Sequence, residues 1–189
     1  MVYARTVGDA DLTFIVSGKL WRNSLIMMDE ETGSLWSHVT GECLEGEHAG
    51  AVLDVVPSVQ TSWAEWKSAH PATRVLEKSD EITSSHYEEY FADPDKAGLF
   101  RTQWLMGRMS AKTLVHGVTV GLHAAAVVDS SLAGGEEVEA DLGGVLVAIR
   151  RDPDGGVRAL RRDTAERLPV KTSFWFAWSA FYPNTVVLD

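Results

Sequence analysis

The strongest constraint on the fold of this chain is a passage that occurs twice. Residues 59–76 and residues 170–188 both contain Trp-x-x-Trp, a proline five residues later, and then Thr-x-Val-Leu. The spacing places both indoles on one face of a helix, the proline ends that helix, and the β-branched residues that follow predict a strand. A stable open solenoid needs at least about three repeats. The sequence therefore predicts one domain, residues 1–189, with internal pseudo-symmetry.

Each copy of the repeat follows a predicted β-hairpin turn. Asp29–Gly33 precedes the first copy and Asp152–Gly156 precedes the second, and both turns contain glycine, which readily adopts positive φ. The full hairpin-helix-strand units extend over about residues 12–77 and 145–189. We expect the two units to be equivalent, with Trp66 and Trp178 both largely buried.

The remaining pattern predicts the α+β class, with mostly antiparallel β-sheet and two short aromatic helices. The first helix covers residues 62–69, because Ser62 is a good N-cap and Glu65 stands at N3. The second covers residues 174–181. Runs of β-branched and large apolar residues predict strands, at residues 12–16, 24–28, 35–39, 51–56, 73–76, 113–120, 145–149, 156–160 and 185–188.

Charge and cysteine content exclude several classes of protein. The formal net charge is −10, with 27 acidic and 17 basic residues, so the surface repels phosphate backbones and we expect no nucleic-acid partner. Cys43 is the only cysteine, which rules out an intrachain disulfide. Residues 1–5 lack a signal-peptide pattern, and no apolar run approaches the roughly 18 residues of a membrane span. We therefore expect a cytoplasmic chain that does not enter a membrane.

Several segments, spread over nearly the whole chain, together resemble the bacterial DUF3179 family of unknown function. They are residues 12–21, 32–37, 41–42, 61–66, 70–71, 174–178 and 182–183. The resemblance implies a fold and a domain extent, but no particular chemistry. Typical members carry a Cys-Pro-x-Cys-like segment before the strand at residues 12–16, and nothing here matches it, so the resemblance does not extend to those thiols. Longer relatives also imply an uncovered sheet edge or apolar face, which predicts a homo-oligomer.

The chain lacks the short motifs of the common nucleotide-binding, hydrolase and metalloprotease classes. Its densest group of reactive side chains is the segment from His38 to His48, in which Cys43 lies between the two imidazoles with three carboxylates among them. Thiolate and imidazole together suit copper or zinc, and in some sites iron. The spacing matches no established metal motif, and the same residues fit a small buried cysteine with two surface histidines.

A histidine within an apolar strand adds to this hypothesis. His116 lies among valines and leucine, where a polar side chain needs a partner. The first functional hypothesis is therefore a transition-metal protein with His38, Cys43 and His116 as ligands to copper, zinc or iron, acting as a small oxidoreductase. Glu42 would serve as a fourth ligand or as a hydrogen-bond acceptor for one of the three.

Two other functions remain open. Cys43 is the candidate nucleophile of a thiol-dependent enzyme, with His38 or His48 as its base. Alternatively, the chain is a non-catalytic binding or assembly module whose aromatic helices are buried in a subunit contact. The expected partners are a small-molecule substrate or a metal ion under the first two hypotheses, and another subunit under the third.

Overall fold

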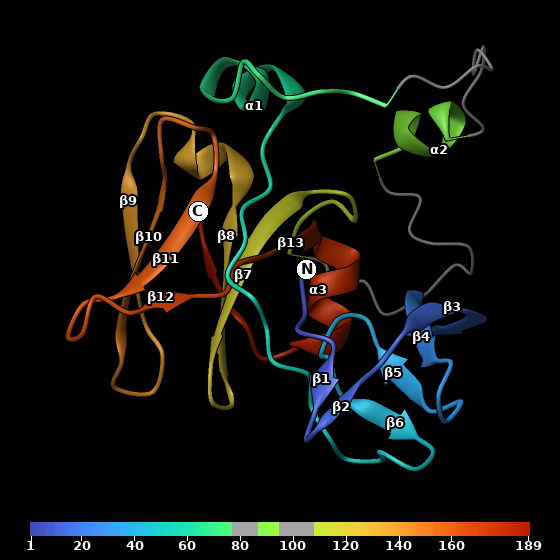
Figure 1. Cartoon of the computed structure of the whole chain (residues 1–189). Coiled ribbons are helices and arrows are strands. Elements are labelled where there is room, and N and C mark those ends of the chain that lie inside the picture. The colour runs from blue at the N-terminus through green and yellow to red at the C-terminus, as the bar shows by residue number, and fades with distance from the viewer. Residues whose placement is uncertain (77–86, 95–107) are drawn as a thin grey trace.

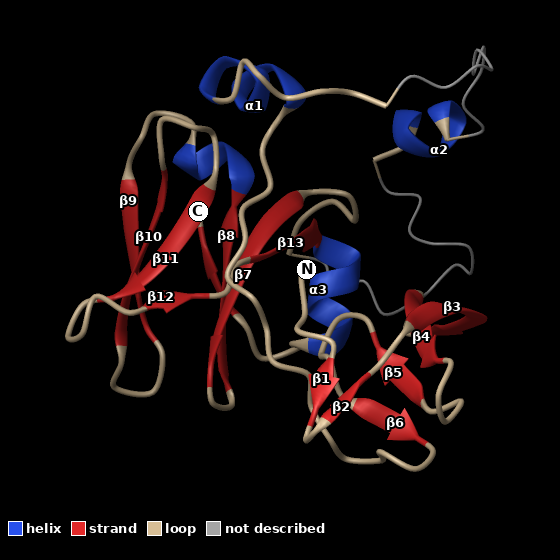
Figure 2. Cartoon of the chain, in the orientation of Figure 1, coloured by secondary structure: helices blue, strands red, loops and turns tan. Residues whose placement is uncertain are grey.

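The computed structural model describes residues 1–76, 87–94 and 108–189. Their strands form one two-stranded and three four-stranded sheets, in which almost all neighbours are antiparallel, and the helices are few and short (Figures 1 and 2). The predicted α+β class is confirmed. Among these residues, no helix is long and apolar enough to cross a bilayer.

The N-terminal part of the chain forms a small β-rich lobe. Its strands are β1 (Thr6–Val7), β2 (Ala10–Asp11), β3 (Phe14–Trp21), β4 (Ser24–Asp29), β5 (Leu35–Ser37) and β6 (Cys43–Glu45). The four longer strands pair in the order β3-β4-β5-β6. Trp36 fills the core of this lobe with Leu12, Cys43 and Leu53. The buried Asp29 carboxylate accepts a hydrogen bond of 2.8 Å from Trp36 Nε1, which fixes the indole.

The C-terminal part of the chain forms two sheets that share one core. The first has the order β12-β11-β10-β9 and the second the order β13-β7-β8-β14. Their bounds are β7 Leu114–Val120, β8 His123–Val128, β9 Glu137–Asp141, β10 Leu146–Arg151, β11 Val157–Arg161, β12 Arg167–Leu168, β13 Lys171–Phe174 and β14 Val186–Leu188. Val118 and Val127 of the second sheet pack against Val147 and Ile149 of the first. Because alternate residues along each strand share a face, this core takes only one side of β7 and β8.

Helix α3 (Trp175–Phe181) covers the other side of β7 and β8, and its Trp175 and Trp178 are fully buried there. The strand before it, β13, pairs antiparallel with β7, and the strand after it, β14, pairs parallel with β8. The unit β13-α3-β14 therefore pairs with both edges of the β7–β8 hairpin and packs on one of its faces. Figure 1 shows α3 lying between this sheet and the N-terminal lobe.

Helix α1 (Trp63–Ala69) begins as the sequence predicts. The Ser62 side chain accepts from the Glu65 backbone N–H, and the Glu65 carboxylate accepts from the Ser62 N–H, which is a complete capping box. No residue of α1 is buried. In Figure 1 the helix lies at the end of the molecule, beside the upper ends of β10 and β11 and far from β3–β6. The other described helices are α2 (Glu88–Ala92) and the 3₁₀ turn η1 (Asp129–Leu132).

Two predicted strands are absent from the described chain. Residues 51–56 contribute only isolated bridges, Val52 to Glu42 and Val55 to Tyr3, because the stretch pairs first with residues 41–43 and then with residues 2–4, and with neither over a full strand. Residues 73–76 pair with nothing, although the matching residues of the second copy form β14. A β-branched sequence becomes a strand only where a neighbour offers backbone groups to pair with.

The two halves also share a turn, although it is not the one expected. In the Asp29–Gly33 turn, the Gly33 N–H donates to the Asp29 carbonyl, and Gly33 has a φ of 71°. The same pattern recurs where the Ala165 N–H donates to the Arg161 carbonyl and Ala165 has a φ of 57°. The counterpart of Asp29–Gly33 is therefore Arg161–Ala165, between β11 and β12, and not Asp152–Gly156.

Candidate functional site

The first two predicted metal ligands lie in the N-terminal lobe. Cys43 begins β6 and is buried, and its thiol donates a hydrogen bond of 3.4 Å to the Glu45 carbonyl oxygen. Burial raises the pKa of this thiol above its ordinary value. His38 follows β5 and is half-buried, and burial lowers the pKa of its imidazole. A protonated, inaccessible thiol is a poor nucleophile and a poor ligand, so Cys43 has the properties of a structural cysteine.

The third predicted ligand, His116, lies in β7 and is buried. Its Nδ1 is 3.0 Å from Thr172 Oγ1 on β13, and its Nε2 is 2.7 Å from Asp129 Oδ1 on η1. Burial lowers the pKa of His116, against the opposing effect of the Asp129 carboxylate. Arg151 also donates to Asp129 and completes the network. Both ring nitrogens are thus occupied, as the apolar setting of this histidine required.

The structure does not bring the three predicted ligands together. His38 and Cys43 belong to the lobe of β3–β6, whereas His116 belongs to the sheet of β7 and β8. Across the ranges that the structure describes, no three His, Cys, Asp or Glu side chains are grouped so that they could hold a metal ion. The metal hypothesis therefore remains a prediction without a ligand cluster behind it.

A buried lysine, which no sequence pattern identifies, joins the N-terminal lobe to the rest of the molecule. Lys171 of β13 donates hydrogen bonds of 3.0 Å to the Val39 carbonyl and to the Tyr182 hydroxyl. Beside it, the Tyr3 hydroxyl donates to the His38 carbonyl at 2.9 Å, and burial raises the pKa of Tyr3 well above its usual range. Because Lys171 and Val39 are 132 residues apart, no local pattern could have revealed their contact.

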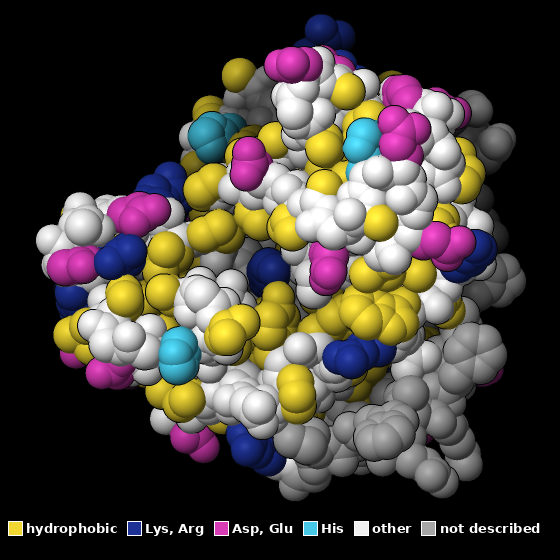
Figure 3. All heavy atoms as spheres, turned by 90° about the horizontal axis from the view of Figure 1, so that it is seen from below, with side chains coloured by type: hydrophobic (Ala, Val, Ile, Leu, Met, Phe, Trp, Pro, Cys, Tyr) yellow, Lys and Arg dark blue, Asp and Glu magenta, His cyan; other side chains and the backbone are white. Residues whose placement is uncertain are grey.

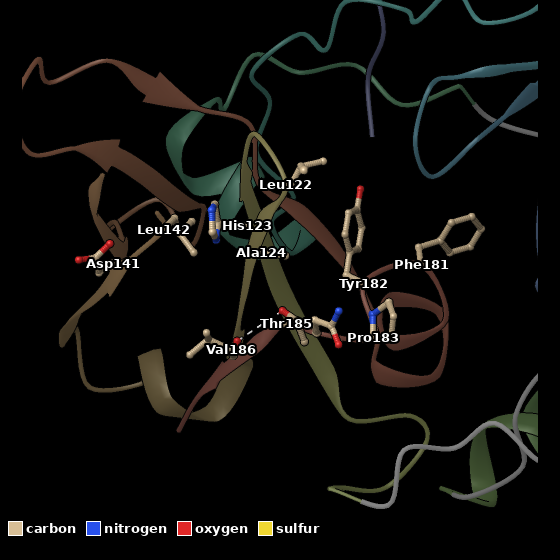
Figure 4. Close-up of a pocket in the computed structure, with 11 residues that line it drawn as sticks. Leu122, His123, Ala124, Asp141, Leu142, Phe181, Tyr182, Pro183, Thr185 and Val186 are labelled. Atoms are coloured by element: carbon tan, nitrogen blue, oxygen red, sulfur yellow. Dashed lines mark hydrogen bonds between the residues drawn. The ribbon is translucent and has the colours of Figure 1, made fainter. Parts of the chain in front are cut away.

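Tyr182 also lines a hollow of about 360 Å³ between the β7–β8 turn, β9 and the loop after α3. Figure 4 shows its ring on one wall and His123 opposite, with Asp141 at the outer edge. The described residues leave the His123 imidazole and the Asn184 amide without a hydrogen-bond partner. The volume suits a small polar molecule.

A third candidate feature is a set of exposed apolar side chains in the first copy of the repeat. Trp63 and Trp66 on α1 are 52% and 40% exposed, and Val75 and Leu76 in the segment that follows are 69% and 87% exposed. We call these four residues the α1 face. Exposed aromatic and aliphatic side chains on a helix and the segment that follows it are a feature of many surfaces that bind another protein.

The local geometry of α1 matches that of α3 closely. Trp66 Nε1 donates to Thr73 Oγ1 at 3.0 Å, and Trp178 Nε1 donates to Thr185 Oγ1 at 3.0 Å. The helices end alike, at His70 with φ −129° and ψ 68° and at Tyr182 with φ −125° and ψ 66°. The ring of each of these residues packs on its Trp, with centroids 4.2 and 4.1 Å apart. The predicted equivalence of the two helices is correct.

The prediction that both tryptophans are buried is wrong for Trp66. Trp178 is 1% exposed because it lies flat on β7, where a Cβ added to Gly117 would come within 2.1 Å of the indole ring. Trp66 is 40% exposed, and none of the strands that the structure describes lies beneath it. The difference lies in the β7–β8 hairpin, which covers the second copy and has no counterpart over the first among the described residues.

The charges near the surface do not point to a polyanionic partner. Figure 3 shows the face seen from below, where acidic, basic and hydrophobic side chains are interspersed. Within the second half, the arginines pair with neighbouring carboxylates, as Arg158 does with Asp152 and Asp154, and Arg162 with Glu137 and Glu139. Paired charges of both signs create no basic field for a phosphate backbone.

Comparison with known proteins supplies the family. A family model described as a protein of unknown function, DUF3179, matches residues 1–167. The chain belongs to the DUF3179 family. No curated protein and no solved structure matches it. The match covers the first copy of the repeat completely and stops before β13 and α3, so membership in DUF3179 includes the unit that carries the α1 face.

Proposed function

We propose that this chain is a non-catalytic protein-binding module whose binding surface is the α1 face. The observation that carries the proposal is the contrast between two tryptophans in one local geometry, with Trp178 1% and Trp66 40% exposed. In the second copy this geometry serves to bury an apolar helix face against a neighbouring element. The first copy keeps the same side chains in the same arrangement, although the described chain gives them no such neighbour.

Helix α1 is fixed in place before any partner binds. A seven-residue helix is far too short to be stable alone. Its N-terminal end is fixed to the β10–β11 turn, where Thr61 Oγ1 donates to the Asp154 carbonyl at 2.7 Å and Val59 packs beside Gly156. Because the helix is anchored before association, a partner need not supply the free energy for ordering it.

The charged side chains of α1 itself have partners within the helix and its C-terminal turn. The Glu65 carboxylate accepts the hydrogen bond from the Ser62 N–H in the capping box. The Lys67 ammonium donates to the Pro71 carbonyl at 3.1 Å and to the Thr73 carbonyl at 3.4 Å. A partner that covers Trp63 and Trp66 would therefore desolvate apolar surface, with a gain of roughly 25 cal/mol for each Å², without burying an unpaired ion.

The test is photo-cross-linking in the cell that produces the protein. p-Benzoylphenylalanine replaces Trp63, and the matched control carries it at Val16, which is 71% exposed on β3. We expect a discrete adduct from position 63 that is absent from position 16 and is lost when Trp66→Ser is added. If position 63 gives no adduct beyond that of position 16, the proposed function is wrong.

The other hypotheses remain predictions. Binding of copper, zinc or iron and oxidoreductase activity require metal in protein purified without an affinity tag, and Cys43→Ser should then lower the metal content. His86, the control histidine for that experiment, lies outside the described residues. A thiol enzyme requires alkylation of Cys43 to abolish an activity.

A small-molecule partner would have the hollow beside Tyr182 available. A homo-oligomer would give a light-scattering mass at a multiple of 20.7 kDa, and fractionation would establish the compartment.

A further inference from the structure

We infer that the partner of the α1 face is a β-hairpin built like β7–β8 and supplied by a polypeptide other than this chain; the inference rests on the proposed function. The second copy of the repeat serves as a template. There, β13, α3 and β14 enclose a hairpin along both edges and over one face. The first copy has the same helix, the same cap and the same Trp–Thr hydrogen bond, so a hairpin of the same kind fits it.

The start of the helix provides the first specific requirement. In α3 the backbone N–H groups of Trp175 and Phe176 donate to the carbonyls of Thr113 and Ala111, at 2.8 and 3.0 Å, just before β7. At the matching positions of α1, the N–H groups of Trp63 and Ala64 make no hydrogen bond within the described part of the chain. A partner strand that enters as β7 does would satisfy both groups with its carbonyl oxygens.

The indole provides the second requirement. Trp178 lies so close to β7 that only glycine is accommodated at position 117. Because Trp66 is fixed to Thr73 just as Trp178 is fixed to Thr185, its indole would lie equally close to a partner strand. The partner hairpin should therefore carry glycine beneath Trp66, at the position that Gly117 has in the template.

The segment after the helix provides the third requirement. Val186, Val187 and Leu188 pair in parallel with Ala125, Ala126 and Val127 of β8. The matching segment, residues 73–76, is unpaired and ends in two exposed apolar side chains. A second partner strand rich in alanine would pair with it and leave room for Val75. Residues 114–128 of the template contain no Asp, Glu, Lys or Arg, so a hairpin of this kind would bring no charge against the apolar side chains of the α1 face.

A second copy of this chain does not meet these requirements. Its own β7–β8 hairpin is already enclosed by β13, α3 and β14, with Trp175 and Trp178 buried on it. To bind α1 of a neighbour, that hairpin would have to release α3, and the apolar surface exposed there would equal the surface covered. The exchange gives no net burial, so the hairpin comes from a different polypeptide.

The probe for the test is a synthetic peptide of residues 111–130 of this chain, which contains the template hairpin. It is titrated into the intact protein while the Trp66 indole N–H resonance is followed by NMR; the resonance is assigned with Trp66→Phe. An isolated hairpin is marginally stable and must fold as it binds. We therefore expect a Kd on the order of 0.1 mM, a peptide with Gly117→Val at least tenfold weaker, and a similar loss for Trp66→Ala protein. Protein with Val16→Ala should bind unchanged.

A fusion protein tests the same contact if the free peptide does not fold. Residues 111–130 are joined to the N-terminus through a long Gly/Ser linker, which gives an effective concentration of about 1 mM. We expect the Trp66 indole N–H to become protected from hydrogen exchange in this fusion, and to stay unprotected when the fused hairpin carries the Gly117→Val change. The inference is overturned if the Gly117→Val change or the Trp66→Ala substitution leaves the binding affinity unchanged. It is also overturned if neither the peptide nor the fusion affects the Trp66 indole N–H.

The two proposals can fail separately. If position 63 cross-links to a partner while peptide and fusion are inactive, the chain is a binding module and the hairpin inference is wrong. If the adduct has twice the mass of the chain, the partner is a second copy, and the hairpin inference is again wrong. If no adduct forms, the proposed function itself fails.

Discussion

Truncating the two equivalent tryptophans should have very different effects on stability. Trp178→Ala removes a side chain that is 1% exposed, packs on Gly117 and Tyr182 and donates to Thr185. Loss of a large core aromatic costs about 3–5 kcal/mol of unfolding free energy. Trp66→Ala removes a side chain that is already 40% exposed and contacts His70 and Thr73 of its own unit. We expect it to cost about 1 kcal/mol, in the range of partly exposed positions.

The assay is urea unfolding followed by circular dichroism, with the free energy taken from the midpoint at constant m-value. A difference of at least about 2 kcal/mol between the variants corresponds to roughly 4–8 °C in the melting midpoint of a chain of this size. Trp178→Phe, which keeps an aromatic ring, guards against complete unfolding of the alanine variant and should fall between the two. Equal costs for Trp66→Ala and Trp178→Ala would refute the claim that α1 lacks a covering element.

Three further predictions concern the second half of the chain. Gly117→Ala should destabilise the protein by roughly 3 kcal/mol or more, because the new Cβ would overlap the Trp178 indole; Thr119→Ala on the same strand is the control, and unfolding curves that coincide would contradict the packing. Burial opposes ionisation of Asp129, but hydrogen bonds from His116 and Arg151 hold its pKa below the ordinary value. The stabilisation from this carboxylate is therefore complete above its unfolded pKa near 3.9 and is lost as the pH falls through the folded pKa. Asp129→Asn should lower stability at neutral pH and flatten the acid limb of the stability curve, and an unchanged acid limb would count against the network. Lys171→Ala removes one of the two donors to the Val39 carbonyl, which keeps the Tyr3 hydroxyl at 3.1 Å, and opens a cavity beside Tyr182. A loss of roughly 2–3 kcal/mol is expected. A thermal midpoint equal to that of Lys112→Ala, whose hydrogen bond is exposed, would show that the buried contact adds nothing.

Local signals in the sequence were sufficient wherever structure is set by neighbours along the chain. Ser62 and Glu65 predicted a capping box, and the hydrogen bonds are present. The Trp-x-x-Trp spacing and the following prolines predicted the two short helices and their ends. Caps and i, i+3 contacts depend on a few adjacent residues, so a single sequence contains the information needed to place them.

Features set by distant contacts were not predictable in this way. Strand β8 contains three consecutive alanines, which favour no strand, and it exists because β7 and β14 pair with it on both sides. Lys171 is buried because the Val39 carbonyl and the Tyr182 hydroxyl meet there. The candidate ligands His38, Cys43 and His116 share suitable chemistry, but the topology places them in different sheets.

The exposure of Trp66 belongs to this second group, and for that reason it is informative about function. The first copy retains every local feature that the second copy uses to present an indole to a glycine: the cap at residue 70, the ring packed on the Trp and the hydroxyl of Thr73. Those features fix a large apolar side chain in one orientation, which costs conformational entropy. In the second copy the cost is offset by burial on β7. In the first copy no described residue buries the indole in this way, and burial on a partner would supply the missing compensation, which is why the rigid, exposed indole supports the proposed binding function.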